Sequence, residues 1–214
     1  MPEITVHGIP GSPYVRAVLL GCLEKGISYR LQPMAMELMY SAQHLALHPF
    51  ARIPIIEHGD FRLYETQAIL RYINDAFAGP ALVPDSPKAR ARMNQAMGIS
   101  DSYVFPSISQ GIVWNRIIAA RFGKSCDESV VQAALPKAQT CINALDEVLG
   151  ADPYITGSKV SLGDLLLAPH IDFLPGVVEG SEMLKGTRVE LWLNRMRGRS
   201  SMQATTWDRL INAA

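Results

Sequence analysis

Cysteine is scarce in this sequence: only Cys22, Cys126 and Cys141 occur among 214 residues, and no two of them form a CxxC pair. An odd number of cysteines at unrelated spacings argues against a disulfide framework and against a cysteine-based zinc site. We therefore expect no metal cofactor, and a reducing cytoplasm is the expected compartment.

The sequence also has no excess of charge of either sign. The 20 basic and 20 acidic residues balance, which argues against a general affinity for nucleic acid or for anionic membranes. No uncharged apolar run is long enough to span a membrane. The first eight residues lack the basic and apolar regions of a signal peptide, so none is expected. The length suits one large domain or two small ones.

The first 78 or so residues alternate predicted strands and helices. Strands of β-branched and apolar residues are expected at 4–7, 28–32, 53–57 and 61–64, and helices at 13–25, at 37–47 and from Thr66. The order βαβαββα predicts an α/β domain of thioredoxin-like layout over residues 1–78. Its first two strands should be parallel because a helix joins them.

Glycine and proline then cluster, which predicts a linker over residues 79–87. Residues 88–214 are predicted to form an all-helical domain. Its first helix should span about 88–121 with a kink at Pro106, and its second should span 128–149.

Ser161 and Asp164 stand three residues apart, immediately before the apolar run 165–168. This spacing is typical of a capping box at the start of a buried helix. We interpret both side chains as structural.

The segment 51–73 carries the strongest indication of a binding site. Pro54 lies in the first strand of a predicted hairpin, where it cannot donate a ladder hydrogen bond, so Ile53 would keep its backbone N–H and C=O free. Glu65 and Thr66 place a carboxylate and a hydroxyl at a helix start, where outward-pointing N–H groups favour an anion. Together these features predict a site for a small peptide-like ligand.

This segment resembles the glutathione-binding half of soluble glutathione S-transferases, whose pattern is roughly N-P-F-G-x-V-P followed by E-S-x-A-I. The corresponding residues here are His48-Pro49-Phe50-Ala51-Arg52-Ile53-Pro54 and Glu65-Thr66-Gln67-Ala68-Ile69. The resemblance implies that Pro54 is cis and that Ile53 pairs its backbone with the cysteinyl unit of glutathione. It also implies that Glu65 and Thr66 hold the γ-glutamyl end.

Arg52 lies two residues before Pro54, where relatives carry a residue that touches the glycine carboxylate of glutathione. A guanidinium suits a carboxylate, so Arg52 is a further predicted contact. The alternative is a solvated surface arginine. Met39 and Tyr40 occupy the positions where phi-type relatives carry a His-Lys pair, which predicts weaker or differently arranged binding of the glycine end.

Glutathione chemistry needs the thiolate, whereas a free cysteine thiol with a pKa of about 8.5 is mostly protonated at neutral pH. Residues 10–16 resemble the turn of delta- and theta-type transferases in which a serine donates to the sulfur, and Ser12 is that serine. The proline after it stands one place early. A plain helix N-cap at Ser12, Tyr14 as the hydroxyl and His7 as a base stay open as alternatives.

The resemblance extends over nearly the whole chain and is closest to theta-, delta- and phi-like bacterial members of serine type. It implies a glutathione transferase that joins the thiol to a small hydrophobic electrophile, with glutathione peroxidase activity as a further expectation. A non-catalytic glutathione-binding or scaffold protein is the alternative. A thiol–disulfide reductase is disfavoured because Ser12 occupies the place of its cysteine.

The electrophile pocket is expected to be lined mainly from the long helix after the linker. The candidates are Tyr103, Phe105, Ile108, Trp114 and Trp207. The resemblance also implies a homodimer with two-fold symmetry. Whether Phe50 inserts into the partner, and whether Asp101 reaches the partner's ligand, stays open.

Overall fold

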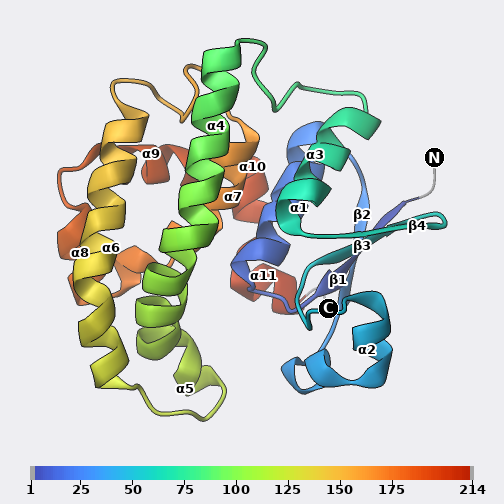
Figure 1. Ribbon diagram of the computed structural model, residues 1–214, viewed down its shortest axis with the longest axis horizontal. Helices are drawn as coiled ribbons and strands as arrows, with labels where there is room; N and C mark the ends of the chain where they lie inside the picture. The colour runs from blue at the N-terminus through green and yellow to red at the C-terminus, as the bar shows by residue number, and fades with distance from the viewer. Residues whose placement is uncertain (1–2, 213–214) are drawn as a thin grey trace. The chain divides into compact units, whose positions relative to one another are not determined.

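The computed structural model describes residues 3–212, which divide into two compact units (Figure 1). The first unit holds the described residues up to Leu82 together with those from Arg199 onward, and the second is Val83–Gly198. The predicted all-helical domain included the end of the chain, whereas in the structure the segment from Arg199 packs with the first unit. Residues 77–86 join α3 (Thr66–Ala76) to α4 (Pro87–Ile99), so the predicted linker, 79–87, lies in this connection and in the first residue of α4.

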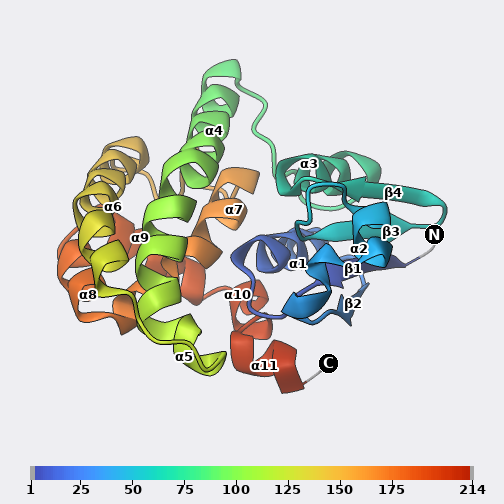
Figure 2. The same cartoon turned by 60° about the horizontal axis from the view of Figure 1, so that its bottom comes forward.

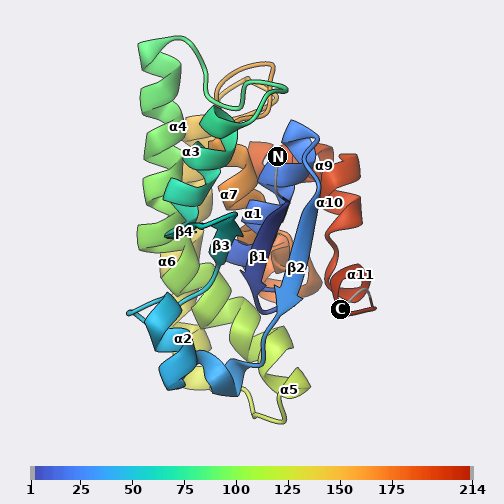
Figure 3. The same ribbon diagram turned by 90° about the vertical axis from the view of Figure 1, so that its right-hand side faces the viewer.

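The first unit contains one four-stranded sheet in the order β2-β1-β3-β4 (Figure 3). β1 and β2 are parallel, while β1 with β3 and β3 with β4 are antiparallel. The elements are β1 (Ile4–Gly8), α1 (Pro13–Lys25), β2 (Tyr29–Pro33), η1 (Met36–Tyr40), α2 (Ala42–Leu47), β3 (Ile55–His58), β4 (Phe61–Tyr64) and α3 (Thr66–Ala76). The predicted βαβαββα layout is therefore confirmed.

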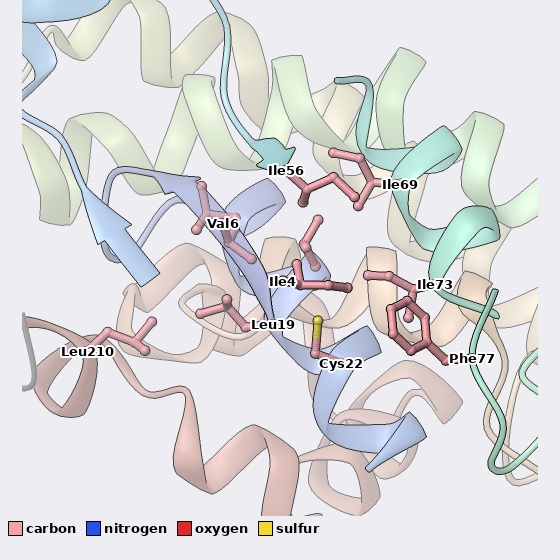
Figure 4. Packing of buried hydrophobic residues seen from close by; sticks show 11 residues of the cluster. Ile4, Val6, Leu19, Cys22, Ile56, Ile69, Ile73, Phe77 and Leu210 are labelled. Atoms are coloured by element: carbon pink, nitrogen blue, oxygen red, sulfur yellow. The ribbon is translucent and has the colours of Figure 1, made fainter. Parts of the chain in front are cut away.

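One apolar cluster joins the sheet to α1 and α3 (Figure 4). Ile4 and Val6 of β1 are fully buried in it, whereas the alternate residue His7 faces the other side of the sheet, because side chains alternate along a strand. Leu19 of α1 and Ile73 of α3 fill the cluster from the helices.

Two predicted elements differ from the structure in their bounds. β3 begins at Ile55 and not at Ile53, because Pro54 has no N–H to offer to a strand partner. The helix expected over 37–47 is broken at Ser41 into the short 3₁₀-helix η1 and α2. Ser41 causes the break, since its side chain accepts a hydrogen bond from the His44 N–H (3.2 Å) and so caps α2.

The second unit is helical (Figure 2). Its elements are α4 (Pro87–Ile99), η2 (Ser100–Ile118), α5 (Ala119–Arg121), α6 (Glu128–Leu149), α7 (Leu162–Ile171), η3 (Leu174–Gly176), α8 (Val178–Leu184) and α9 (Arg188–Arg197). None of the helices between residues 3 and 212 is both long enough and apolar enough to cross a membrane.

The long segment from α4 to α5 is not the single α-helix that the sequence predicts over about 88–121. η2 is instead a π-helix of 19 residues with Pro106 inside it, so its backbone is wound more widely than in α4. At its end, the Ala119 N–H donates to the carbonyl of Trp114, five residues back.

α7 is the central helix of this unit, and every one of its residues is buried. The predicted capping box is present at its start: the Ser161 N–H donates to the Asp164 carboxylate (2.8 Å). Its position among α4, η2 and α9 explains why the run after Asp164 is continuously apolar.

Candidate active site

The strand register brings the predicted binding segments to one end of the sheet. His7 near the end of β1 pairs with Ile55 at the start of β3, and Ile55 pairs with Tyr64 at the end of β4. The turn after β1, the residues before β3 and the residues after β4 therefore share an edge. These three segments hold the predicted site residues Ser12, Arg52, Ile53, Glu65 and Thr66.

Ile53 has the backbone that the sequence predicts for a peptide-binding residue. The Ile53–Pro54 bond is cis. No other described residue forms a backbone hydrogen bond with the N–H or C=O of Ile53. Nearby, His44 Nε2 donates to the carbonyl of Arg52 (3.0 Å) and supports this loop. A peptide-like ligand can therefore pair with the main chain of Ile53 as an added strand would.

Glu65 is held in an unusual backbone conformation, with φ at +71° and ψ at 109°. A residue with a side chain adopts such a conformation at a cost of about 1–3 kcal/mol, and such residues gather at functional sites. Its side chain is exposed, and no described residue bonds to its carboxylate. Thr66 follows as the first residue of α3 and is 8% exposed. An exposed carboxylate beside a helix N-terminus suits a zwitterionic ligand, since the carboxylate attracts an ammonium and the helix end attracts a carboxylate.

Ser12 is the N-cap of α1, followed by Pro13 at the first helical position. The Val15 N–H donates to Ser12 Oγ at 3.5 Å, which is long for this type of bond. Accepting that bond uses a lone pair of the oxygen and leaves the hydroxyl proton available. The N-cap role and a donor role toward a ligand are therefore compatible.

The alternatives to Ser12 are His7 and Tyr14, and His7 has a structural role that explains it. His7 Nε2 lies 3.0 Å from Glu57 Oε2, and this bond, followed by that from Arg62, lowers the pKa of the Glu57 carboxyl. His7 is thus engaged with a strand neighbour, as expected for a structural residue. Tyr14 is half-buried in the first turn of α1 and stays an alternative hydroxyl.

The glycine end of the predicted site has one charged candidate. Arg52 is exposed beside Ile53, so its guanidinium can reach solvent or a ligand. Tyr40, at the position where phi-type relatives carry a charged residue, is 79% exposed. Between Met36 and Tyr40 the side chains are apolar apart from Glu37.

An apolar groove lies in the second unit between η2 and α6, with a volume of about 700 Å³. Tyr103, Pro106, Val130, Ala134 and Cys141 are among its lining residues. Of the predicted electrophile-pocket residues, Tyr103 lines this groove, whereas Ile108 is fully buried in the core. Trp114 stacks on Phe122 with ring centroids 5.8 Å apart.

No group of three or more metal-ligating side chains is found among residues 3–212.

Comparison with known proteins identifies the family. Residues 6–81 match the glutathione S-transferase N-terminal domain, and residues 99–199 match the C-terminal domain. Glutathione S-transferase F12 of Arabidopsis thaliana is 31% identical over 97% of both chains. The chain therefore belongs to the glutathione S-transferase family. It is a glutathione transferase, and glutathione is its co-substrate.

Solved structures share the fold. Glutathione transferase F7 from Populus trichocarpa has a TM-score of 0.84 at 24% identity, with coverage of 94% of this chain and 97% of that one. Glutathione S-transferase I from mais, in complex with an atrazine glutathione conjugate, has a TM-score of 0.84 at 21% identity, with coverage of 99% and 100%. Glutathione S-transferase F12 and glutathione transferase F7 are plant proteins of the F series, whereas the sequence pattern suggests bacterial members.

Proposed function

We propose that this transferase activates the thiol of glutathione through Ser12, which donates a hydrogen bond to the sulfur and so favours the thiolate. This proposal rests on the Ser12 hydroxyl at the N-terminus of α1, which accepts a bond from the Val15 N–H and keeps its own proton available for a ligand. Lowering a thiol pKa by two units requires about 2.7 kcal/mol of preference for the anion. A hydroxyl donor together with the positive end of a 13-residue helix supplies a preference of that order.

The remaining contacts hold glutathione along the sheet edge. The N–H and C=O of Ile53 pair with its cysteinyl unit, Glu65 and Thr66 bind the γ-glutamyl end, and Arg52 binds the glycine carboxylate. The second substrate is a small hydrophobic electrophile or an organic hydroperoxide, and the reaction takes place in the cytoplasm. A kinetic panel of an aryl halide, an epoxide, an isothiocyanate and cumene hydroperoxide tests the choice between transferase and peroxidase activity.

Ser12→Ala tests the mechanism. We expect kcat/KM to fall by about one to two decades, or about 1.4–2.7 kcal/mol, the size of one hydrogen bond to a charged acceptor. The pKa of bound glutathione should rise toward its free value, measured from the ultraviolet absorbance of the thiolate. Glutathione affinity should change far less, because the serine contacts only the sulfur.

Thr187→Ala is the matched control, since Thr187 likewise caps a helix through its side chain but belongs to α9 of the second unit, outside the predicted site segments. It should lose about 1 kcal/mol of stability, as a lost N-cap does, and keep the thiol pKa of the parent. Equal thiol pKa values in Ser12→Ala and the parent protein would remove Ser12 from the mechanism and make Tyr14 the next candidate.

We further propose a homodimer with two-fold symmetry in which Phe50 of each copy enters the η2–α6 groove of the other. Phe50 is 67% exposed although its ring is large and apolar, and it stands edge-on to Tyr64 (6.4 Å between centroids). The groove is apolar and large enough for a benzyl side chain. In a two-fold dimer each such contact occurs twice, so one ring and one groove per chain suffice.

Phe50→Ala should shift the protein toward monomers in light scattering at micromolar concentration. Truncating a central interface anchor costs about 2 kcal/mol or more, and the two-fold dimer loses two such anchors, so the dissociation constant should rise by about three decades. Leu191→Ala removes another exposed apolar side chain, 63% accessible on α9, and should leave the assembly unchanged. A parent protein that is already monomeric contradicts the proposal.

A further inference from the structure

The last described stretch of the chain, residues 199–212, forms what we call the C-terminal strap. It contains α10 (Ser200–Ala204) and α11 (Trp207–Asn212), and it packs with the first unit although it is farthest from that unit in sequence. Three separate contacts fasten it to α1 and to the turn before α1.

The first contact is ionic. Glu24 near the end of α1 accepts hydrogen bonds from Arg199 Nε (2.7 Å) and from the Ser201 hydroxyl. Burial opposes ionisation of Glu24, but the bonds from Arg199 and Ser201 outweigh it and lower the pKa of this carboxyl. The start of the strap is thereby fixed to the far end of α1.

The second contact lies one turn from Ser12. Arg16 is 3% exposed and donates from Nε to Thr205 Oγ1 (3.2 Å) and from Nη2 to the carbonyl of Met202 (3.1 Å). The Arg16 N–H also donates to the Ser12 carbonyl (2.9 Å). Arg16 thus connects the middle of the strap to the first turn of α1.

The third contact is with the turn itself. Gly11 has φ at +88°, and a Cβ added to it would lie 2.2 Å from Cε3 of Trp207, so the indole ring packs directly on the Gly11 backbone. Leu210, one turn further along α11, is buried in the apolar cluster under β1 and α1 (Figure 4). The chain is therefore anchored on both sides of Trp207, before it by the bonds of Arg16 to Met202 and Thr205 and after it by Leu210 in the core.

We propose that Trp207 is a positioning residue for thiol activation: its ring fixes the Gly11–Ser12 turn so that the Ser12 hydroxyl points at the sulfur of bound glutathione. This inference rests on the proposed role of Ser12. The physical reason is that glycine has more backbone freedom than any other residue, so a turn built on Gly11 needs a packing partner to hold one geometry. A hydrogen bond to sulfur weakens steeply as its angle departs from linearity, so a loosened turn loses thiolate stabilisation.

A different role for Trp207 makes a different prediction. If the indole only forms a wall for the electrophile, its removal changes the KM of the electrophile and leaves the thiol pKa of the glutathione complex where it was. If the indole positions Ser12, the thiol pKa changes before any electrophile is present. The binary complex with glutathione therefore separates the two roles.

The experiment is an ultraviolet titration of the thiolate in the glutathione complexes of the parent protein, Trp207→Ala, Trp207→Phe and Ser12→Ala. We expect Trp207→Ala to raise the thiol pKa by about half a unit to one unit, a threefold to tenfold loss of thiolate below that pKa. Trp207→Phe keeps an aromatic ring over Gly11 and should restore most of the parent value. Arg209→Ala, on the exposed side of α11, is the matched control and should have no effect.

The outcomes are separable. A raised pKa in both Ser12→Ala and Trp207→Ala supports the positioning role. A raised pKa in Ser12→Ala with a parent-like value in Trp207→Ala overturns it and leaves the proposed function intact. A parent-like value in Ser12→Ala overturns the serine mechanism, and the positioning role with it. If Trp207→Ala fails to fold, Trp207→Leu keeps a smaller apolar side chain without the flat ring and is read in the same way.

Discussion

Replacing Asp164 with alanine is expected to lower the free energy of unfolding by about 3–5 kcal/mol, a large share of the stability of a domain this size. The carboxylate is fully buried and accepts four hydrogen bonds. Oδ1 accepts from the Ile155 N–H (3.0 Å) and Trp192 Nε1 (2.8 Å), and Oδ2 accepts from the N–H (2.8 Å) and hydroxyl (2.7 Å) of Ser161. Burial raises the pKa of the Asp164 carboxyl, while the hydrogen bonds from Ile155, Ser161 and Trp192 oppose that shift.

The magnitude follows from what alanine leaves behind. Two backbone N–H groups and one indole N–H would remain buried without an acceptor, and each costs about 1–3 kcal/mol. Urea unfolding followed by circular dichroism measures the change. Asp164→Asn should lose less, because one oxygen survives, and Asp152→Ala on the surface of the same unit should change stability by less than about 0.5 kcal/mol. A loss below 1 kcal/mol in Asp164→Ala would mean that the unit repacks around the missing carboxylate.

Local signals predicted the helices that have clear ends. The bounds of α1 agree with the prediction because Ser12-Pro13 starts it and Gly26, in a left-handed conformation with φ at 71°, stops it. α6 likewise agrees, since the Asp127 side chain accepts from two N–H groups at its start and Gly150 follows its end. In these helices sequence and tertiary structure favour the same boundaries.

Other features depend on contacts that no local pattern reveals. The strap is joined to α1 by bonds between residues as far as 189 positions apart, Arg16 and Thr205. The π-helical winding of η2 was also missed, because the apolar spacing of an α-helix and of a π-helix are too similar over a few turns. The strap was assigned to the helical domain because its composition is helical, and composition does not say which surface a helix covers.

The site was predictable where backbone chemistry limits the choice of residue. The resemblance to glutathione S-transferases implied the cis bond at Ile53–Pro54, whereas the proline in a hairpin strand by itself predicted only that the Ile53 backbone stays unpaired. The register of three strands explains why Ser12 and Glu65, 53 positions apart in sequence, lie at one edge of the sheet. The positive φ of Glu65 could not be predicted, since nothing in the residue type suggests it. That unusual conformation makes Glu65 the most informative residue to replace.

Glu65→Ala is expected to weaken glutathione binding by about 2–3 kcal/mol, or roughly 30- to 150-fold in dissociation constant. The estimate lies toward the lower end of what losing one partner of a charge pair costs, because Glu65 is exposed and water screens the pair. The backbone of Ile53 and the N-terminus of α3 remain, so binding should not be abolished. Calorimetric titration with glutathione measures the change.

Glu65→Gly separates the ligand role from a structural one. Glycine adopts φ near +71° without the clash that a Cβ causes. The free energy of unfolding of Glu65→Gly should therefore be about 1 kcal/mol higher than that of Glu65→Ala. Both variants should lose glutathione affinity to the same extent. Such a pair of results means that the fold tolerates strain at residue 65 in order to present a carboxylate to the ligand. If Glu65→Gly instead binds glutathione as the parent does, the carboxylate is not a ligand contact, and the γ-glutamyl end must be held by Thr66 and the helix N-terminus alone.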